Sequence, residues 1–337
     1  MSATLPEDQR LVSISPRAFE HPADRAATAA LQSIPMLDTV VRKLIEFGYE
    51  RALRQTLLAS SVRLGPEQLP HVWADYNAVL ARLDMPDVYD LYLTQFPMAN
   101  AAAIGSGKPM IVVNSRTIEL LDELELRTVL GHEAAHVLAD HVLYRTALII
   151  LLRLTAFGRL PAIAGLPLMG VKLALLEWFR AAELSCDRAG ALVTRDPMVT
   201  CRTLMVLAGG TASSKLDLNV FVAQAAEYEE AGSGWDRLSR LSTELSQDHA
   251  VPVRRVRELM LWVQSGDYDR ILRGEYIRRG EEPGLREEAE TAKDFYVERF
   301  RGFFRDAGEA AQKAGDSLAD AGDRLSEWLR NRPSDAR

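Results

Sequence analysis

Two histidines four residues apart flank a glutamate in the run VLGHEAAHVLADH, as His132, Glu133 and His136. On a helix, residues four apart lie one above the other, so both imidazoles can face one ion while Glu133 lies on the neighbouring edge. The alternative is a surface helix that carries histidines by chance. The spacing favours a catalytic zinc site, in which three protein ligands hold the metal and water takes the fourth position.

The third ligand has to come from another part of the chain. His141 lies five residues beyond His136, about 140° further round an ideal helix, so we expect it to face elsewhere and to make a structural hydrogen bond. A metzincin protease would need a glycine and a third histidine where this chain has Ala139 and Val142. That class of zinc protease is therefore excluded.

An acidic pair in the run FRAAELSCDRAG supplies the natural candidate. Glu183 and Asp187 are four residues apart on a predicted helix, so Glu183 can reach the zinc while Asp187 accepts the N–H of a liganding histidine. Taken alone, the pair would be read as exposed acids. Cys186 lies between them, and its thiolate could compete for zinc. Because Cys186 falls on a different helical row from Glu183, a small buried thiol is expected.

With HExxH followed by ExxxD, the chain resembles the HtpX-like zinc metallopeptidases, a gluzincin family whose relatives include the CAAX prenyl endopeptidases and the Oma-type proteases. The upstream run NAAAIGSGKPMIVVNSRTIELLDELELRTVLGHE also follows the family pattern. The resemblance implies that His132, His136 and Glu183 bind one Zn²⁺ ion. It further implies that Glu133 is the general base and that Asp187 supports a ligand.

The chain departs from the family near SQDHAVPVRRVREL, where relatives often carry a His-Pro pair. Here His249 is followed by Ala250. We treat His249 as a candidate catalytic residue that polarises the substrate carbonyl. The alternative is a structural histidine that caps a helix.

Hydrophobic periodicity predicts an α+β fold that is predominantly helical, with a zincin-like catalytic domain, a small sheet and an active-site helix. The β-rich runs VYDLYLTQF, NAAAI and MIVVN predict the sheet, and an extended peptide is expected to pair with its edge near NAAAI or MIVVN. We expect four parts: a polar, poorly ordered N-terminal segment (1–34), N-terminal helices (35–84), the zinc metallopeptidase domain (85–280) and an amphipathic helical tail (281–337).

The most apolar stretch runs from Thr146 to Phe179. Two membrane spans would need roughly 20 apolar residues each plus a turn, and this stretch is too short for both. A single span would separate the two halves of the zinc site across a membrane. Arg153, Arg159 and Lys172 also interrupt it. A helical hairpin is therefore expected, packed on the protein or lying on a membrane surface, with the Phe-rich tail as a second possible contact for lipid or a partner protein.

The composition of the chain excludes some classes of function and indicates a cellular location. A net charge of −7 gives no support for nucleic-acid binding. Two cysteines indicate no disulfide framework, and the polar N-terminus lacks the apolar run of a signal peptide. We therefore expect a cytoplasmic protein that is in part peripheral to a membrane.

The sequence predicts a zinc-dependent metalloendopeptidase that acts on polypeptides. The alternatives are a zinc hydrolase of non-peptide amides and a catalytically weak, zinc-stabilised scaffold or chaperone-like protein.

Overall fold

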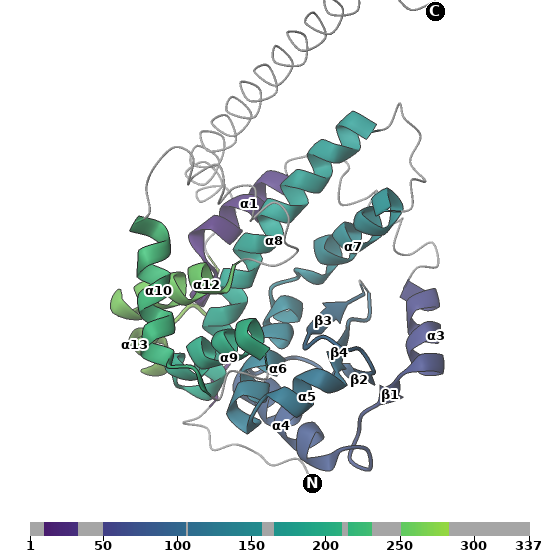
Figure 1. The fold of residues 1–337 in the computed structure, drawn as a ribbon, viewed down its shortest axis with the longest axis horizontal. Coiled ribbons are helices and arrows are strands. Elements are labelled where there is room, and N and C mark those ends of the chain that lie inside the picture. The colour runs from purple at the N-terminus through teal and green to yellow at the C-terminus, as the bar shows by residue number, and fades with distance from the viewer. Residues whose placement is uncertain are drawn as a thin grey trace, which may run out of the picture. The chain divides into compact units, whose positions relative to one another are not determined.

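Helices dominate the computed structural model and accompany one small sheet, which confirms the predicted α+β class (Figure 1). Residues Met1–Gly284 form one compact unit, and Leu285–Arg337 form a second. The predicted tail lies almost entirely outside the described residues. The structure describes residues 10–32, 50–105, 107–156, 165–210, 215–230 and 251–282.

The described elements include strands in all three runs that the sequence predicts, together with a two-residue strand at Val62–Arg63 that it does not predict. The helices are η2 (Pro16–Ala18), α1 (Pro22–Gln32), α3 (Glu50–Ser60), α4 (Pro70–Arg82), α5 (Ser115–Leu120), α6 (Glu123–Leu138), α7 (Val142–Ala156), α8 (Gly165–Thr194), α9 (Pro197–Gly209), α10 (Leu218–Glu230), α12 (Pro252–Gln264) and α13 (Asp267–Leu272). The strands are β1 (Val62–Arg63), β2 (Asp90–Thr94), β3 (Ala101–Ile104) and β4 (Met110–Asn114).

The four strands form a mixed sheet in the order β1-β2-β4-β3. β2 and β4 are parallel, while β1 and β3 pair antiparallel with their neighbours. The run MIVVN forms β4, which has a partner on each side, so the expectation that it offers an edge to a peptide is wrong. The run NAAAI contains β3, which is an edge strand of the sheet.

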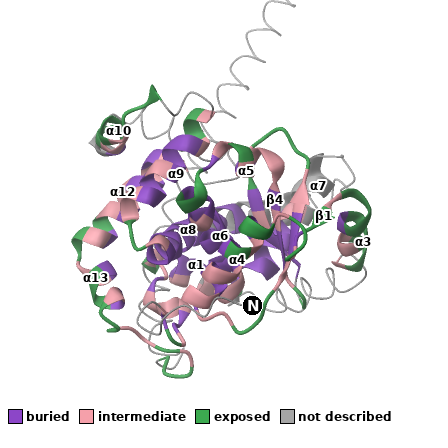
Figure 2. Cartoon of the chain, turned by 90° about the horizontal axis from the view of Figure 1, so that it is seen from below, coloured by how far each residue is buried: buried purple, intermediate pink, exposed green. Residues whose placement is uncertain are grey.

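Helix α6 carries the HExxH motif through the middle of the core (Figure 2). A capping box defines its start, because Glu125 N–H donates to the Asp122 side chain and Asp122 N–H donates to the Glu125 side chain, both at 2.9 Å. The helix is buried over most of its length and packs against α4, α8, α9 and β3. Its neighbours therefore fix the direction of each motif side chain.

Two glycines mark the place where α6 and α8 approach closely. A Cβ atom built on Gly131 of α6 would lie 2.8 Å from Val193 Cγ2, and one on Gly190 of α8 would lie 3.1 Å from the carbonyl oxygen of Thr128. Side chains at these positions would push the helices apart. The glycines therefore let α6 bring its histidines close to the acidic residues of α8.

Residues 10–32 fold onto the body, so the expectation of a poorly ordered segment over 1–34 is wrong for this part. Helix α1 lies beside α8 (Figure 1), and Arg188 donates to the carbonyl oxygens of Phe19 and Glu20 at 3.3 and 3.1 Å. Local periodicity does not reveal this burial, because it depends on contacts with residues far along the chain. The buried apolar side chains are Leu11, Ile14, Phe19, Ala26, Ala27 and Leu31.

The described parts of the apolar stretch from Thr146 to Phe179 belong to α7 and α8, which pack against each other. The side chains of residues 150–174 lie outside the described part. That the hairpin packs on the protein or lies on a membrane surface therefore stays a prediction. Among the described residues, none of the helices is both long enough and apolar enough to cross a lipid bilayer.

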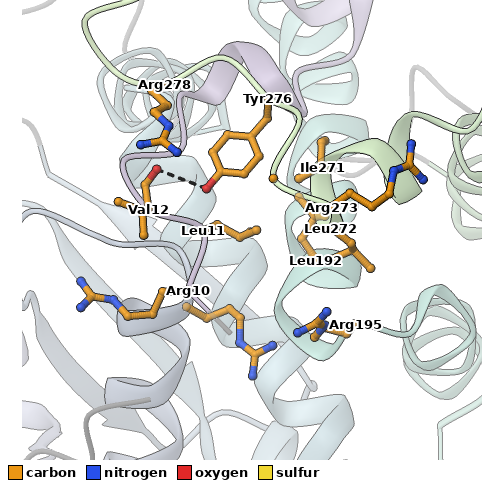
Figure 3. A pocket seen from close by; sticks show the side chains of 12 residues that line it. Arg10, Leu11, Val12, Leu192, Arg195, Ile271, Leu272, Arg273, Tyr276 and Arg278 are labelled. Carbon is orange, nitrogen blue, oxygen red and sulfur yellow. Dashed lines mark hydrogen bonds between the residues drawn. The ribbon is translucent and has the colours of Figure 1, made fainter. Parts of the chain in front are cut away.

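A cavity of about 260 Å³ lies where the N-terminal segment meets the turn after α13 (Figure 3). Tyr276 closes one side, where its hydroxyl donates to the carbonyl oxygen of Val12 at 3.2 Å. Three helices, α4, α8 and α13, end beside the cavity, and basic side chains stabilise the negative ends of helix dipoles. Arg82, Arg195 and Arg273 stand at or next to these helix ends, and Arg10 pairs with Asp84, while Arg278 also lines the cavity.

We predict that Gly131→Ala lowers the free energy of unfolding by about 1–2 kcal/mol, since the added methyl overpacks the helix crossing by more than the gain in helix propensity. Urea unfolding measures the change. Combining it with Val193→Ala, which removes the clashing methyl groups, should cost less than the sum of the two single changes. An unchanged or higher stability of Gly131→Ala would show that the crossing is not tight.

Candidate metal centre

Three side-chain atoms from α6 and α8 meet in a small triangle. His132 Nε2 and His136 Nε2 are 3.2 Å apart. Glu183 Oε1 lies 3.2 Å from His136 Nε2 and 3.5 Å from His132 Nε2. All three residues are at most 8% exposed. The structure thus brings together the three residues that the sequence predicts as ligands.

The size of this triangle can be compared with that of a zinc site. In a tetrahedral site with metal–ligand distances of about 2.0–2.1 Å, neighbouring ligand atoms lie about 3.3–3.4 Å apart. The three distances observed here, 3.2, 3.2 and 3.5 Å, lie just below and just above this range. Two imidazole nitrogens and one carboxylate oxygen are also a donor set that zinc takes in catalytic sites. The residues present therefore fit a zinc ion.

Arg255 of α12 fixes the two acids of α8. Its guanidinium lies 3.1 Å from Glu183 Oε2 and donates to Asp187 Oδ1 and Oδ2 at 2.6 and 2.7 Å. The Glu183 carboxylate therefore binds Arg255 through Oε2 and faces the histidines through Oε1. Asp187 also accepts from His132, whose Nδ1 lies 3.2 Å from Asp187 Oδ1. This contact orients the ring so that Nε2 faces the triangle.

The two histidines of the motif differ in their protonation. Burial opposes a charge on His132, but the carboxylates of Glu183 and Asp187 raise its pKa to about 9. Burial, together with the Arg145 guanidinium, lowers the pKa of His136 to about 3. His136 is thus a neutral ligand at pH 7, and metal binding would release one proton from His132.

Glu133 follows His132 on α6, and β3 and α7 hold its carboxylate. Its Oε2 accepts from the N–H of Ala103 in β3 at 2.6 Å and from Arg145 NH1 at 2.7 Å. Burial would raise the pKa of this carboxyl, but Arg145 and the neighbouring imidazoles hold it below its usual value. Glu133 is therefore ionised at neutral pH and is able to accept a proton.

Side chains of α6 and α7 cover part of the free edge of β3. Ala103 donates to Glu133, Arg145 NH2 lies 3.5 Å from the carbonyl oxygen of Ala101, and Thr146 bonds to the backbone of Gly105. A peptide that pairs along the whole edge would have to replace all of these contacts, whereas one that pairs only at Ala101 would replace the contact from Arg145. The bond from Arg145 to Ala101 is the longest of them and the easiest to give up.

Two of the candidate ligands, His132 and Glu183, line a cavity of about 360 Å³, while His136 is fully buried and does not line it. Its wall combines the metal-site residues with apolar and hydroxyl side chains of α9 and with the chain that leads into β3. Such a cavity, apolar with a few polar groups on one side, is a common form of substrate site. The residues that line it include His132, Glu133, Glu183, Asp187 and Arg255, together with Met98, Asn100, Ala101, Thr203, Leu204 and Leu207.

Cys186 lies close enough to be weighed as a ligand. Its thiol, His132 and His136 offer ligand atoms that all lie within 4.8 Å of one another. Burial raises the pKa of the thiol well above its usual value, and only the thiolate is a strong ligand. The tighter triangle with Glu183 fits the metal better.

His141 does not face away from His136, so that part of the expectation is wrong, but the expected structural hydrogen bond is present, with His141 Nε2 3.1 Å from Asp24 Oδ2. Helix α6 ends at Leu138, and Asp140 takes a left-handed conformation with φ 55°. The N–H of His141 then donates to the carbonyl oxygen of His136 at 2.9 Å, as in a Schellman turn. The turn brings the His141 ring back, and its Nδ1 lies 3.2 Å from His136 Nδ1. Helical projection fails here because the helix has already ended.

Sequence reasoning missed three charged residues that surround the triangle. Arg145 and Arg255 were not singled out, and Asp24, which contacts His141, lies in the segment expected to be poorly ordered. A buried arginine is rare without an acidic partner, but no local pattern shows which acid it will meet. His249 lies outside the described residues, and its predicted role is untested.

The comparisons with known proteins agree with this geometry. The chain matches the family model Peptidase family M48 over residues 67–263. It is 36% identical over 264 residues to the plastoglobule-localized metallopeptidase 48, chloroplastic, of Arabidopsis thaliana, a match that covers 76% of this chain and 75% of that protein. It is 27% identical over 218 residues to a protease HtpX homolog of Ralstonia nicotianae, covering 56% of this chain and 71% of the relative.

A protease HtpX homolog of Burkholderia multivorans is likewise 27% identical over 223 residues, or 57% of this chain and 73% of that protein. No solved structure gives a significant match. The family match includes the whole of α6 and the acidic pair of α8, so it agrees with the resemblance drawn from HExxH and ExxxD. The chain belongs to peptidase family M48, the HtpX-like metallopeptidases.

Proposed function

We propose that this chain is a zinc-dependent endopeptidase whose metal is held by His132, His136 and Glu183. The observation that carries the proposal is the buried triangle of Nε2, Nε2 and Oε1 atoms with edges of 3.2–3.5 Å beside an open cavity. Asp187 and Arg255 hold this arrangement from behind. Membership of a metallopeptidase family supports the same reaction class.

When bound, zinc supplies a Lewis acid that polarises the scissile carbonyl and makes a nearby water molecule more acidic. Glu133 accepts the proton of the attacking water and then delivers it to the leaving amine. Arg145 keeps Glu133 ionised before the reaction and, through the shared Oε2, fixes the carboxylate relative to β3. We also propose that His249 polarises the carbonyl oxygen, on the basis of the family pattern alone.

A polypeptide substrate would reach the site along the start of β3. Asn100 and Ala101 line the cavity, and β3 is an edge of the sheet. An extended peptide can add to such an edge through backbone hydrogen bonds. Pairing at Ala101 would displace the long contact from Arg145, while the Ala103 N–H remains with Glu133. This placement sets the scissile bond beside the carboxylate that acts as base.

Glu133→Gln should keep zinc and fold while lowering kcat by about 10²–10⁴-fold, because it removes the proton acceptor and no metal ligand. Cleavage of an unfolded protein substrate, measured beside zinc content, checks this. The same variant tests the scaffold alternative, in which the glutamate has no chemical task. Undiminished cleavage by zinc-loaded Glu133→Gln would refute the proposed base.

Glu183→Ala should lose most bound zinc, because two imidazoles alone leave the metal without its anionic ligand. Cys186→Ser is the matched control on the same helix, and it should keep about one zinc per chain by the single-site logic. Metal analysis of both purified variants gives the answer. Full zinc in Glu183→Ala with loss in Cys186→Ser would reverse the ligand assignment.

We propose further that the apolar stretch 146–179 holds the protein at a lipid surface. The support is its composition, together with the name of the Arabidopsis relative, which describes that protein as plastoglobule-localized. The protein should then float with liposomes and be released by carbonate, as a peripheral protein is. A protein that does not float with the liposomes would contradict this proposal. A protein that detergent releases and carbonate does not would also contradict it.

A further inference from the structure

We infer that Asp24, in the N-terminal helix α1, is a positioning residue for the zinc ligand His136 and acts through His141. This inference rests on the proposed function. Asp24 lies outside residues 67–263, the part of the chain that matches the peptidase family. The N-terminal segment is therefore a working part of the metal centre in addition to packing against it.

A chain of polar contacts connects the metal site to α1. His136 faces the triangle with Nε2, and its Nδ1 lies 3.2 Å from His141 Nδ1. The other nitrogen of His141, Nε2, lies 3.1 Å from Asp24 Oδ2. All three side chains are at most 2% exposed. Water therefore does not compete for these bonds.

The chemistry of a metal-bound imidazole fixes the donors along this chain. Once Nε2 of His136 binds zinc, its Nδ1 carries the hydrogen and donates to His141 Nδ1. His141 must then carry its hydrogen on Nε2, from which it donates to Asp24. The Asp24 carboxylate holds this tautomer, and the hydrogen-bonded chain makes His136 a more basic and better oriented ligand.

The Asp24 carboxylate is itself held in place from α8. Ser185 Oγ donates to Asp24 Oδ2 at 2.5 Å, and Thr28 Oγ1 donates to Oδ1 at 3.3 Å. Trp178 Nε1 in turn donates to Thr28 Oγ1 at 2.8 Å. Asp24 therefore keeps one geometry relative to the helix that carries Glu183. The two sides of the metal site, α6 and α8, are joined through α1.

A purely structural role for Asp24 is the competing explanation, because an acid in the first turn of α1 also stabilises that helix. Affinity for zinc separates the two roles, since a structural acid affects folding alone. Asp75 provides the matched control: it is a buried acid with its own partner, Arg127, and it contacts no residue of the metal triangle.

The experiment measures the zinc dissociation constant of full-length protein by competition with a chromophoric chelator, with urea unfolding of the metal-free protein alongside. Asp24→Asn should weaken zinc binding about 10–100-fold, the range for lost partners of liganding histidines. Asp75→Asn should lower stability and leave the zinc affinity at the wild-type value.

His141→Leu is the second variant. It removes the acceptor for His136 Nδ1 and the donor to Asp24, so zinc binding should weaken, while Asp24 still accepts from Ser185 and Thr28. Adding Asp24→Asn to His141→Leu should then cause little further loss, because Asp24 acts through His141. This double variant keeps the inference testable even if Asp24→Asn alone folds poorly.

Wild-type affinity in Asp24→Asn or in His141→Leu would overturn the inference and leave the proposed function intact. Equal losses in Asp24→Asn and Asp75→Asn would also overturn it, in favour of a general effect of buried acids. Zinc binding by the wild-type protein is measured first. If the wild-type protein binds no zinc, the proposed function itself fails.

Discussion

The close crossing of α6 and α8 is the constraint on which the metal centre depends. It brings two imidazoles of one helix within 3.2–3.5 Å of a carboxylate on the other. Gly131 and Gly190 permit the approach, because any side chain at either position would meet the opposite helix. Buried positions along α6 then leave the motif side chains few directions in which to point.

Crowding so many charges into a buried site is unfavourable unless each one has a partner. Arg255 pairs with Asp187 and Glu183, and Arg145 pairs with Glu133. These arginines do more than offset desolvation, because each fixes which oxygen of its carboxylate faces the reaction centre. The candidate site is thus preorganised by the protein.

The triangle of candidate ligands, the candidate base beside it and the small sheet could be predicted from the sequence because they follow local rules. A spacing of four residues on a helix is visible in the chain itself, and so is the alternation of short strands. Asp24, Arg145 and Arg255 could not be predicted in the same way, since their partners lie on other elements. His141 was placed on the wrong side for a local reason: Asp140 ends the helix with a left-handed residue, and aspartate adopts that conformation only at some positions.

X-ray absorption at the zinc edge of the loaded protein tests the central claim most directly, because it counts and identifies the atoms bound to the metal. The account predicts a shell of nitrogen and oxygen at about 2.0–2.1 Å, from His132, His136 and Glu183 with water in the fourth position. A sulfur atom at about 2.3 Å would place Cys186 on the zinc and contradict the ligand set.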